Sequence, residues 1–176
     1  MAFQWGIMGA GAIAGKFADA VRRVEGCETV AVASRDPARA QTFADRHGIP
    51  QAYGSYEDML RHASPDAVYV AARTNAHAEL TRLCVRHGIP VLCEKAMFTS
   101  AAEARELLAL ARERGVFAME AMWSRFLPAV REMKRRLDAG AIGEPLYAEL
   151  SIGWKPPTAR ATGISTRQRA AARRMT

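Results

Sequence analysis

Short apolar runs alternate with longer amphipathic stretches from the start of the chain to about residue 120. The apolar runs show no clean alternation of polar and apolar positions, as expected for strands that helices cover on both faces. Each stretch between them has the periodicity of a helix, which is the order of βαβ units. We predict strands at 4–8, 29–34, 67–71, 90–93 and 116–120, and helices at 13–24, 37–47, 76–87 and 101–114. This pattern predicts a doubly wound parallel α/β sheet of the Rossmann type.

Residues at the predicted helix ends fit these boundaries. Asp36 precedes Pro37, as an N-cap followed by proline at the first helical position. Gly48, Gly88 and Gly115 stand where C-caps are expected. We therefore expect these helices to begin and end close to the predicted positions.

The pattern changes after residue 122. We predict a helix at 127–139 and a strand at 145–154, in which Leu146, Ala148 and Leu150 alternate with polar residues. Such alternation is typical of a half-exposed sheet, unlike the first five strands. The sequence thus predicts a nucleotide-binding domain at 1–122 and a fragment of a second, α+β domain at 123–157.

Positive charge is concentrated at the end of the chain. The net charge is +7, but residues 155–176 contain six basic residues and no acid, and the remainder has a net charge of only +1. Residues 158–176 also lack Leu, Val, Phe, Tyr and Trp, so we predict a disordered basic tail. A natural short form and an out-of-frame reading of a GC-rich gene both fit this composition. Because no aromatic residues accompany the arginines, nucleic-acid binding is not expected.

The other compositional features describe a reduced, non-membrane protein. Cys27, Cys84 and Cys93 are widely spaced and form no CxxC pair, so they predict buried structural thiols, with neither a disulfide nor a metal site. No apolar run approaches the length of a membrane span. The first residues lack the basic region of a secretory signal, and we expect a cytoplasmic location.

A glycine-rich turn separates the first strand from the first helix, with the sequence Gly9-Ala10-Gly11-Ala12-Ile13-Ala14. This strand–turn–helix context is the one that a dinucleotide fingerprint requires. Gly9 would permit the tight turn, Gly11 would let the backbone approach a pyrophosphate, and Ala14 would keep the helix close to the sheet. The free N–H groups and the helix dipole favour phosphate at that point. An ordinary tight turn is the alternative.

The end of the second strand indicates which dinucleotide is preferred. NAD-binding folds commonly place an acidic residue there for the ribose hydroxyls, whereas this chain has Ser34 followed by Arg35. The hydroxyl can donate to a 2′-phosphate and the guanidinium can pair with it. We therefore predict NADP, with NAD as the second option. In the alternative interpretation, Arg35 is a solvated loop residue.

Three further motifs follow later strands: Thr74-Asn75-Ala76-His77, Leu92-Cys93-Glu94-Lys95 and Met119-Glu120-Ala121-Met122-Trp123-Ser124-Arg125-Phe126. Together with the glycine-rich turn, they make residues 3–157 resemble the Gfo/Idh/MocA oxidoreductases. The last motif and Ser34-Arg35 resemble the branch of NADP-dependent D-xylose 1-dehydrogenase and dimeric dihydrodiol dehydrogenase. The resemblance implies hydride transfer between a nicotinamide and the hydroxyl carbon of a small-molecule sugar or cyclic diol. It also implies that residues 123–157 begin a substrate and dimerisation domain, with a homodimer as one outcome.

The resemblance also assigns roles to single residues. Lys95 matches the lysine beside the nicotinamide, where an ammonium group can hydrogen-bond the reacting oxygen, and Glu94 would orient it. Ala96 stands where the family motif has proline. The cofactor-binding set predicted from the turn and the resemblance is Gly9, Gly11, Ala12, Ile13, Ala14, Ser34, Arg35, Thr74, Asn75, His77, Glu94, Lys95, Trp123 and Arg125.

Each of these later roles has an alternative. Lys95 could be a surface lysine paired with Glu94, and His77 a helix-start histidine bonded to the backbone. Trp123 and Arg125 could pack at a domain junction. For the chain as a whole, the alternative to a working dehydrogenase is a remnant that binds NADP but lacks its substrate domain.

Overall fold

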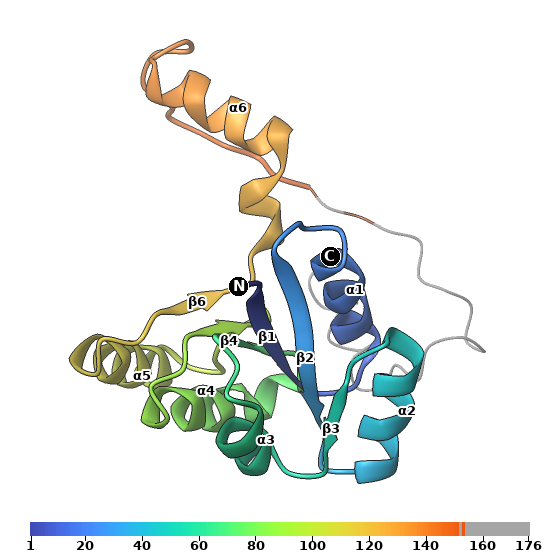
Figure 1. Ribbon diagram of the computed structural model, residues 1–176. Coiled ribbons are helices and arrows are strands. Elements are labelled where there is room, and N and C mark those ends of the chain that lie inside the picture. The colour runs from blue at the N-terminus through green and yellow to red at the C-terminus, as the bar shows by residue number, and fades with distance from the viewer. Residues whose placement is uncertain (152, 154–176) are drawn as a thin grey trace. The chain divides into compact units, whose positions relative to one another are not determined.

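The computed structural model describes residues 1–151 and 153. Its centre is a six-stranded, entirely parallel sheet with the strand order β3-β2-β1-β4-β5-β6 (Figure 1). The strands are β1 (Phe3–Met8), β2 (Cys27–Ala33), β3 (Gln51–Tyr53), β4 (Ala67–Val70), β5 (Val91–Cys93) and β6 (Ala118–Glu120). The order reverses beside β1, which is the topology of a doubly wound dinucleotide-binding fold. The predicted fold class is confirmed.

Helices lie on both faces of the sheet (Figure 1). The α-helices are α1 (Ala12–Val21), α2 (Pro37–His47), α3 (Tyr56–Ala63), α4 (His77–Arg86), α5 (Ala101–Glu113) and α6 (Pro128–Asp138), and two 3-10 turns are η1 (Thr74–Ala76) and η2 (Trp123–Phe126). Asp36 accepts a hydrogen bond from Arg39 N as the N-cap of α2, and Gly48 ends that helix at φ 65°. These two predicted caps are confirmed. The C-caps of α4 and α5 are His87 and Arg114, so Gly88 and Gly115 lie one residue beyond the predicted position, each with a positive φ.

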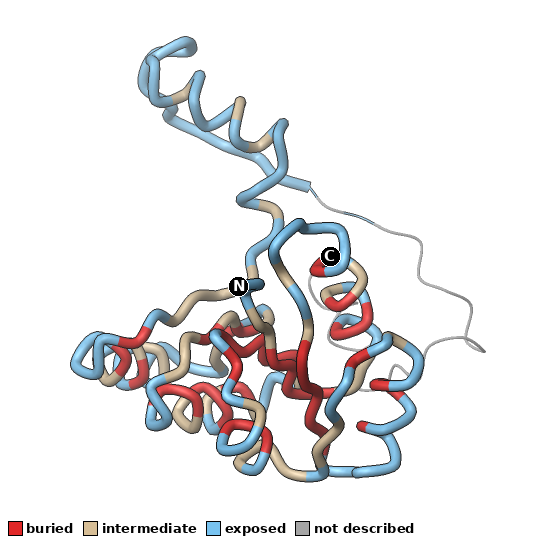
Figure 2. The backbone as a smooth tube through the Cα atoms, viewed as in Figure 1, coloured by how far each residue is buried: buried red, intermediate tan, exposed pale blue. Residues whose placement is uncertain are grey.

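Alternate strand residues build two separate cores, because successive side chains of a strand point to opposite faces. Ile7 packs with Val32 and with residues of α1 and α2, whereas Met8 packs with Val68 and with residues of α3 and α4. Figure 2 shows the buried residues concentrated in the strands and on the inward sides of the helices. Burial on both faces explains why these strands are continuously apolar in the sequence.

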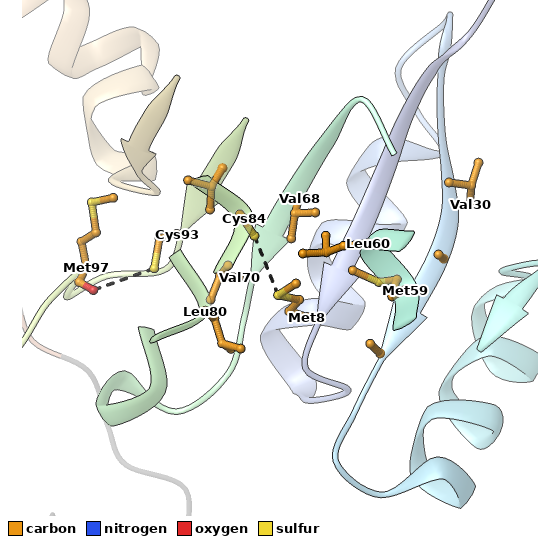
Figure 3. Packing of buried hydrophobic residues seen from close by; sticks show 13 residues of the cluster. Met8, Val30, Met59, Leu60, Val68, Val70, Leu80, Cys84, Cys93 and Met97 are labelled. Atoms are coloured by element: carbon orange, nitrogen blue, oxygen red, sulfur yellow. Dashed lines mark hydrogen bonds between the residues drawn. The ribbon is translucent and has the colours of Figure 1, made fainter. Parts of the chain in front are cut away.

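Two cysteines and three methionines lie within the second of these cores (Figure 3). Cys84 Sγ lies 4.0 Å from Met8 Sδ, and Cys93 Sγ lies 3.8 Å from the carbonyl oxygen of Met97. Burial raises the pKa of each of these two thiols to about 12. Both are free, and Cys27 is half-buried, so the prediction of buried thiols holds for two of the three.

Two predictions about elements were incomplete or wrong. The sequence analysis missed β3 and α3, which lie between residues 51 and 63. The strand predicted at 145–154 is wrong where the structure describes it, since residues 145–151 form no strand and are all exposed. A strand needs a neighbour to pair its backbone groups, and within the described residues this segment has none.

The chain divides into two compact units between Arg131 and Glu132, and all the strands belong to the first unit, Met1–Arg131. The predicted tail at 158–176 lies outside the described residues. Among residues 1–151 and 153, no helix is both long enough and apolar enough to cross a membrane.

Candidate functional site

The predicted site residues gather at one edge of the sheet. Because all six strands are parallel, their carboxyl ends meet at this edge, and ligands of open α/β sheets bind there beside the point where the strand order reverses. Gly9 follows β1, Ser34 follows β2 and Glu94 follows β5. These three residues are far apart in the sequence, and only the sheet brings them to a common edge.

The glycine-rich turn brings β1 close to β4. Gly9 has φ +108°, and a Cβ atom added there would lie 2.8 Å from the carbonyl oxygen of Ala71. Gly9 N donates to Ala33 O at 2.8 Å, so the turn is also tied to β2. A side chain at this position would meet backbone atoms that have no freedom to move away.

Gly11 is different, because a Cβ atom added there would meet no atom within 4 Å. Gly11 is the N-cap of α1, and because glycine has no side chain, no side-chain oxygen accepts a hydrogen bond from the first N–H groups of the helix. The first N–H groups of any helix lack intrahelical partners, and within the described residues Ala12 and Ile13 find no other acceptor. The glycine thus leaves open space beside unpaired N–H donors, and this cradle fits an anion such as a pyrophosphate.

Close packing beneath this turn involves one residue that the sequence analysis missed. Ala14 is fully buried, but Gly15 makes the tighter contact, since a Cβ atom added there would lie 3.1 Å from the ring of His47 in α2. The only sequence feature that could have identified Gly15 is its position directly after the glycine-rich turn. Gly15 therefore permits the close approach of α1 to α2.

Ser34 and Arg35 follow β2, and Arg39 lies in the first turn of α2. The Ser34 hydroxyl is largely buried and accepts the N–H of Asp36 at 3.3 Å, while Arg35 is exposed. Arg39 was not predicted, yet its Nε donates to Ala10 O in the glycine-rich turn at 3.2 Å. It lines a cavity of about 360 Å³ together with Gly11 and other residues of α1 and α2. The sequence signal that was overlooked is a basic residue in the first turn of a helix, where acids are preferred.

The segment after β4 holds three predicted residues in different environments. Thr74 and Asn75 are exposed in η1, whereas His77 is 1% exposed. The His77 ring lies between two backbone carbonyl oxygens, with Nδ1 2.9 Å from Ala96 O and Nε2 3.1 Å from Ala72 O. This is the backbone bonding expected in the alternative interpretation of His77.

Glu94 and Lys95 follow β5 directly. Glu94 accepts hydrogen bonds from the Tyr69 hydroxyl at 2.6 Å and from Lys95 N at 3.2 Å. Burial and the neighbouring carboxylate raise the pKa of Tyr69 well above its usual range, so its hydroxyl stays a donor. The Lys95 side chain is exposed and forms no ion pair with Glu94 or any other described carboxylate. The Lys95–Ala96 peptide bond is cis.

The motif after β6 contributes an apolar wall. Trp123 is 62% exposed in η2, and it lines a pocket of about 270 Å³ with Ile13 and Glu94. Arg125 is exposed and does not line this pocket. Within residues 1–151 and 153, no group of three or more His, Cys, Asp or Glu side chains is placed to hold a metal ion.

Comparisons with known proteins agree with this architecture. The chain is 43% identical over 156 residues to trans-1,2-dihydrobenzene-1,2-diol dehydrogenase of Mus musculus, covering 88% of this chain and 47% of that relative. An oxidoreductase from Agrobacterium radiobacter, solved with NAD+, L-tartaric acid and magnesium, is 26% identical with a TM-score of 0.77, covering 82% of this chain and 42% of that one. A 3-ketoreductase from Actinomadura kijaniata, solved with NADP, is 34% identical with a TM-score of 0.73, covering 82% and 46%.

The chain spans about half the length of the curated relatives it matches. All six strands and the glycine-rich turn lie within residues 3–122. Residues 3–122 match the model of an oxidoreductase family with an NAD-binding Rossmann fold. Since this match extends over most of the sequence, the chain belongs to the Gfo/Idh/MocA oxidoreductase family.

Proposed function

We propose that this chain binds NADP and that its protein is a dehydrogenase acting on the hydroxyl carbon of a sugar or cyclic diol. The observation that carries the proposal is the arrangement of groups along one sheet edge. Unpaired N–H donors lie at the start of α1, basic residues at the end of β2, and Lys95 at the end of β5. The diol dehydrogenase relative and the NADP complex of the 3-ketoreductase support the same assignment.

Phosphate binding is assigned to the turn and to the end of β2. The Gly11 cradle would hold the pyrophosphate, and Ser34, Arg35 and Arg39 would hold a 2′-phosphate. Two guanidinium groups favour such a dianion, because an arginine can pair with phosphate through two parallel N–H donors. An acidic side chain at this strand end would repel it. The first acid after β2 is Asp36, whose carboxylate caps α2.

The reacting end is assigned to Lys95. Its neighbour Glu94 lines the apolar pocket of Ile13 and Trp123, which is assigned to the nicotinamide. When bound, the nicotinamide accepts or supplies the hydride. The Lys95 ammonium would hydrogen-bond the substrate oxygen and stabilise the charge that develops there. The Tyr69–Glu94 hydrogen bond orients the carboxylate that holds Lys95 N. We assign Thr74, Asn75 and Arg125 to the rim of this proposed nicotinamide site.

A titration with NADPH and NADH tests the nucleotide assignment, with tighter binding of NADPH as the expected result. Loss of the 2′-phosphate pairing should weaken binding by at least about tenfold, since a charge-assisted hydrogen bond contributes roughly 1.5–3 kcal/mol. Arg39→Ala should reduce the preference, whereas Arg61→Ala on α3, away from the glycine-rich turn, should leave it unchanged. Equal or tighter binding of NADH would overturn the NADP assignment.

A second candidate function is cofactor binding without turnover. It is favoured by one observation: residues 145–151 have no paired strand within the described part of the chain. An absorbance assay with NADP+ and D-xylose or a cyclic diol separates the two. NADPH formation supports the dehydrogenase, and nucleotide binding with no turnover supports the second candidate.

We also propose that the protein forms a homodimer through the 145–151 segment. Leu146, Tyr147 and Leu150 are each more than four-fifths exposed, and unpaired backbone with apolar side chains is a template for pairing with another chain.

A further inference from the structure

The backbone that follows Lys95 is held from several sides at once. Met97 N donates to Glu120 Oε1 at 2.8 Å, and Ala96 O lies 2.9 Å from His77 Nδ1. The Met97 carbonyl oxygen also accepts from Cys93 Sγ, the contact drawn in Figure 3. Polar groups from β5, β6 and α4 therefore converge on two consecutive residues.

Glu120 is the charged member of this set. It is half-buried at the end of β6, where its backbone pairs with Cys93 of β5. None of the ion pairs among the described residues includes Glu120. A half-buried carboxylate without a cation needs hydrogen bonds to offset its lost hydration, and a bond from a backbone N–H to a carboxylate is stronger than a neutral one. This makes the Glu120–Met97 bond the strongest of the three contacts.

The segment has little else to fix it. Lys95 and Ala96 are exposed, and only Met97 is inserted in the core. The direction of the Lys95 side chain therefore depends on the peptide groups on either side of it. Glu94 fixes the preceding N–H, and Glu120 fixes the N–H two residues further on.

We propose that Glu120 is a positioning residue for Lys95, because its carboxylate holds the Lys95–Met97 segment against the ends of β5 and β6. The inference rests on the proposed function, in which Lys95 serves the nicotinamide end of the cofactor. It assigns to the glutamate of the 119–126 motif a role that the motif itself does not reveal.

Two measurements on the whole chain test this proposal. Hydrogen exchange of peptides covering residues 94–98 reports how firmly the segment is held. Affinities for NADPH and for 2′,5′-ADP, which lacks the nicotinamide, separate the two ends of the cofactor. For Glu120→Ala we expect exchange to accelerate by about tenfold or more. The 2′,5′-ADP affinity should stay the same, and the additional affinity for NADPH should fall.

Three further variants make the result specific. Glu120→Gln keeps an acceptor oxygen at the same reach and should restore most of the wild-type behaviour. Glu120→Asp keeps the charge, but its side chain is too short to reach Met97 N, so it should behave like Glu120→Ala. If the Glu120→Ala protein does not fold, Glu120→Asp takes its place in the comparison. Asp66→Ala is the matched control. Asp66 accepts a hydrogen bond from Gln4 N at 2.7 Å near the amino-terminal ends of the strands, away from Lys95. This variant should change neither readout.

The outcomes are distinguishable. Unchanged exchange in both Glu120→Ala and Glu120→Asp overturns the proposal. Faster exchange with the full NADPH advantage retained also overturns it, since Glu120 would then be structural only. If the wild-type chain binds neither nucleotide, the proposed function fails, and the exchange rates alone decide whether Glu120 holds the segment.

Discussion

Gly9 and Gly11 are two residues apart, yet they serve different requirements. Gly9 has φ +108° and no room for a Cβ atom, whereas Gly11 has φ −105° and open space. We expect Gly9→Ala to lower the free energy of unfolding by about 2 kcal/mol or more, through left-handed strain and a clash with Ala71 O. Gly11→Ala should cost at most about 1 kcal/mol, the usual loss at an N-cap.

Gly11→Ala, the variant with the smaller loss of stability, should have the larger loss of nucleotide affinity. Because the Cβ atom of Gly11→Ala projects toward the proposed phosphate site, NADPH binding should weaken by roughly tenfold or more. Thermal denaturation and a fluorescence titration on the same samples measure both effects. A stable Gly9→Ala protein would contradict the strain argument, and a Gly11→Ala protein with full affinity would contradict the cradle.

At this scale, the sequence predicts residues whose role is local. Gly9 and Gly11 act within one turn, so the fingerprint identified them. Arg39, Gly15 and Glu120 were missed because each acts on a partner distant in the sequence: Ala10, His47 and Met97. Only the sheet and the packing of α1 on α2 bring these pairs together, and the hydrophobic periodicity of the sequence does not predict such contacts.

The cysteines of α4 and β5 give a test of how the helices cover the sheet. Cys84 and Cys93 are fully buried, and burial raises the pKa of each thiol to about 12. At pH 8, far below this value, both thiols stay protonated, and the thiolate is the reactive form. We expect a thiol reagent such as DTNB to modify only the half-buried Cys27 in the native protein, and all three cysteines after unfolding in guanidinium chloride.

Cys27→Ala is the control for this experiment and should remove the native reactivity. Rapid modification of Cys84 or Cys93 in the folded Cys27→Ala protein would mean that α4 does not cover the sheet as described.

Length and packing explain which elements were predictable. Strands β1, β2, β4 and β5 contain residues buried beneath the helices, which makes them apolar in the sequence. The two edge strands, β3 and β6, have three residues each and no buried residue. Only β6 was found, because the apolar Val116 and Phe117 precede it. The helix α3 is short. The sequence feature that could have predicted its start is the N-cap Ser55, whose hydroxyl accepts a hydrogen bond from Asp58 N at 3.2 Å. The predicted strand at 145–154 failed for the opposite reason: its alternation is present, but no neighbouring strand lies within the described residues.

The whole protein must accommodate an apolar segment that its own described residues do not cover. Leu146 and Leu150 are 92% and 87% exposed, and every residue from 145 to 151 is exposed. Burying such side chains against a second copy gains the hydrophobic free energy that the single chain leaves unused. It would also pair backbone groups that now face solvent. We therefore expect light scattering after size exclusion to give the mass of a homodimer, and chymotrypsin to leave the segment intact.

A double substitution separates this dimer from other modes of assembly. Leu146→Lys with Leu150→Lys adds charge to the apolar face, so the protein should become monomeric and chymotrypsin should now cleave after Tyr147. NADPH affinity should not change, because the proposed phosphate-binding residues all lie before residue 40. A control variant on α5, Glu113→Lys, changes an exposed charge in the first compact unit and should stay dimeric. A wild-type monomer in which the 145–151 segment resists chymotrypsin would exclude both the exposed segment and the dimer.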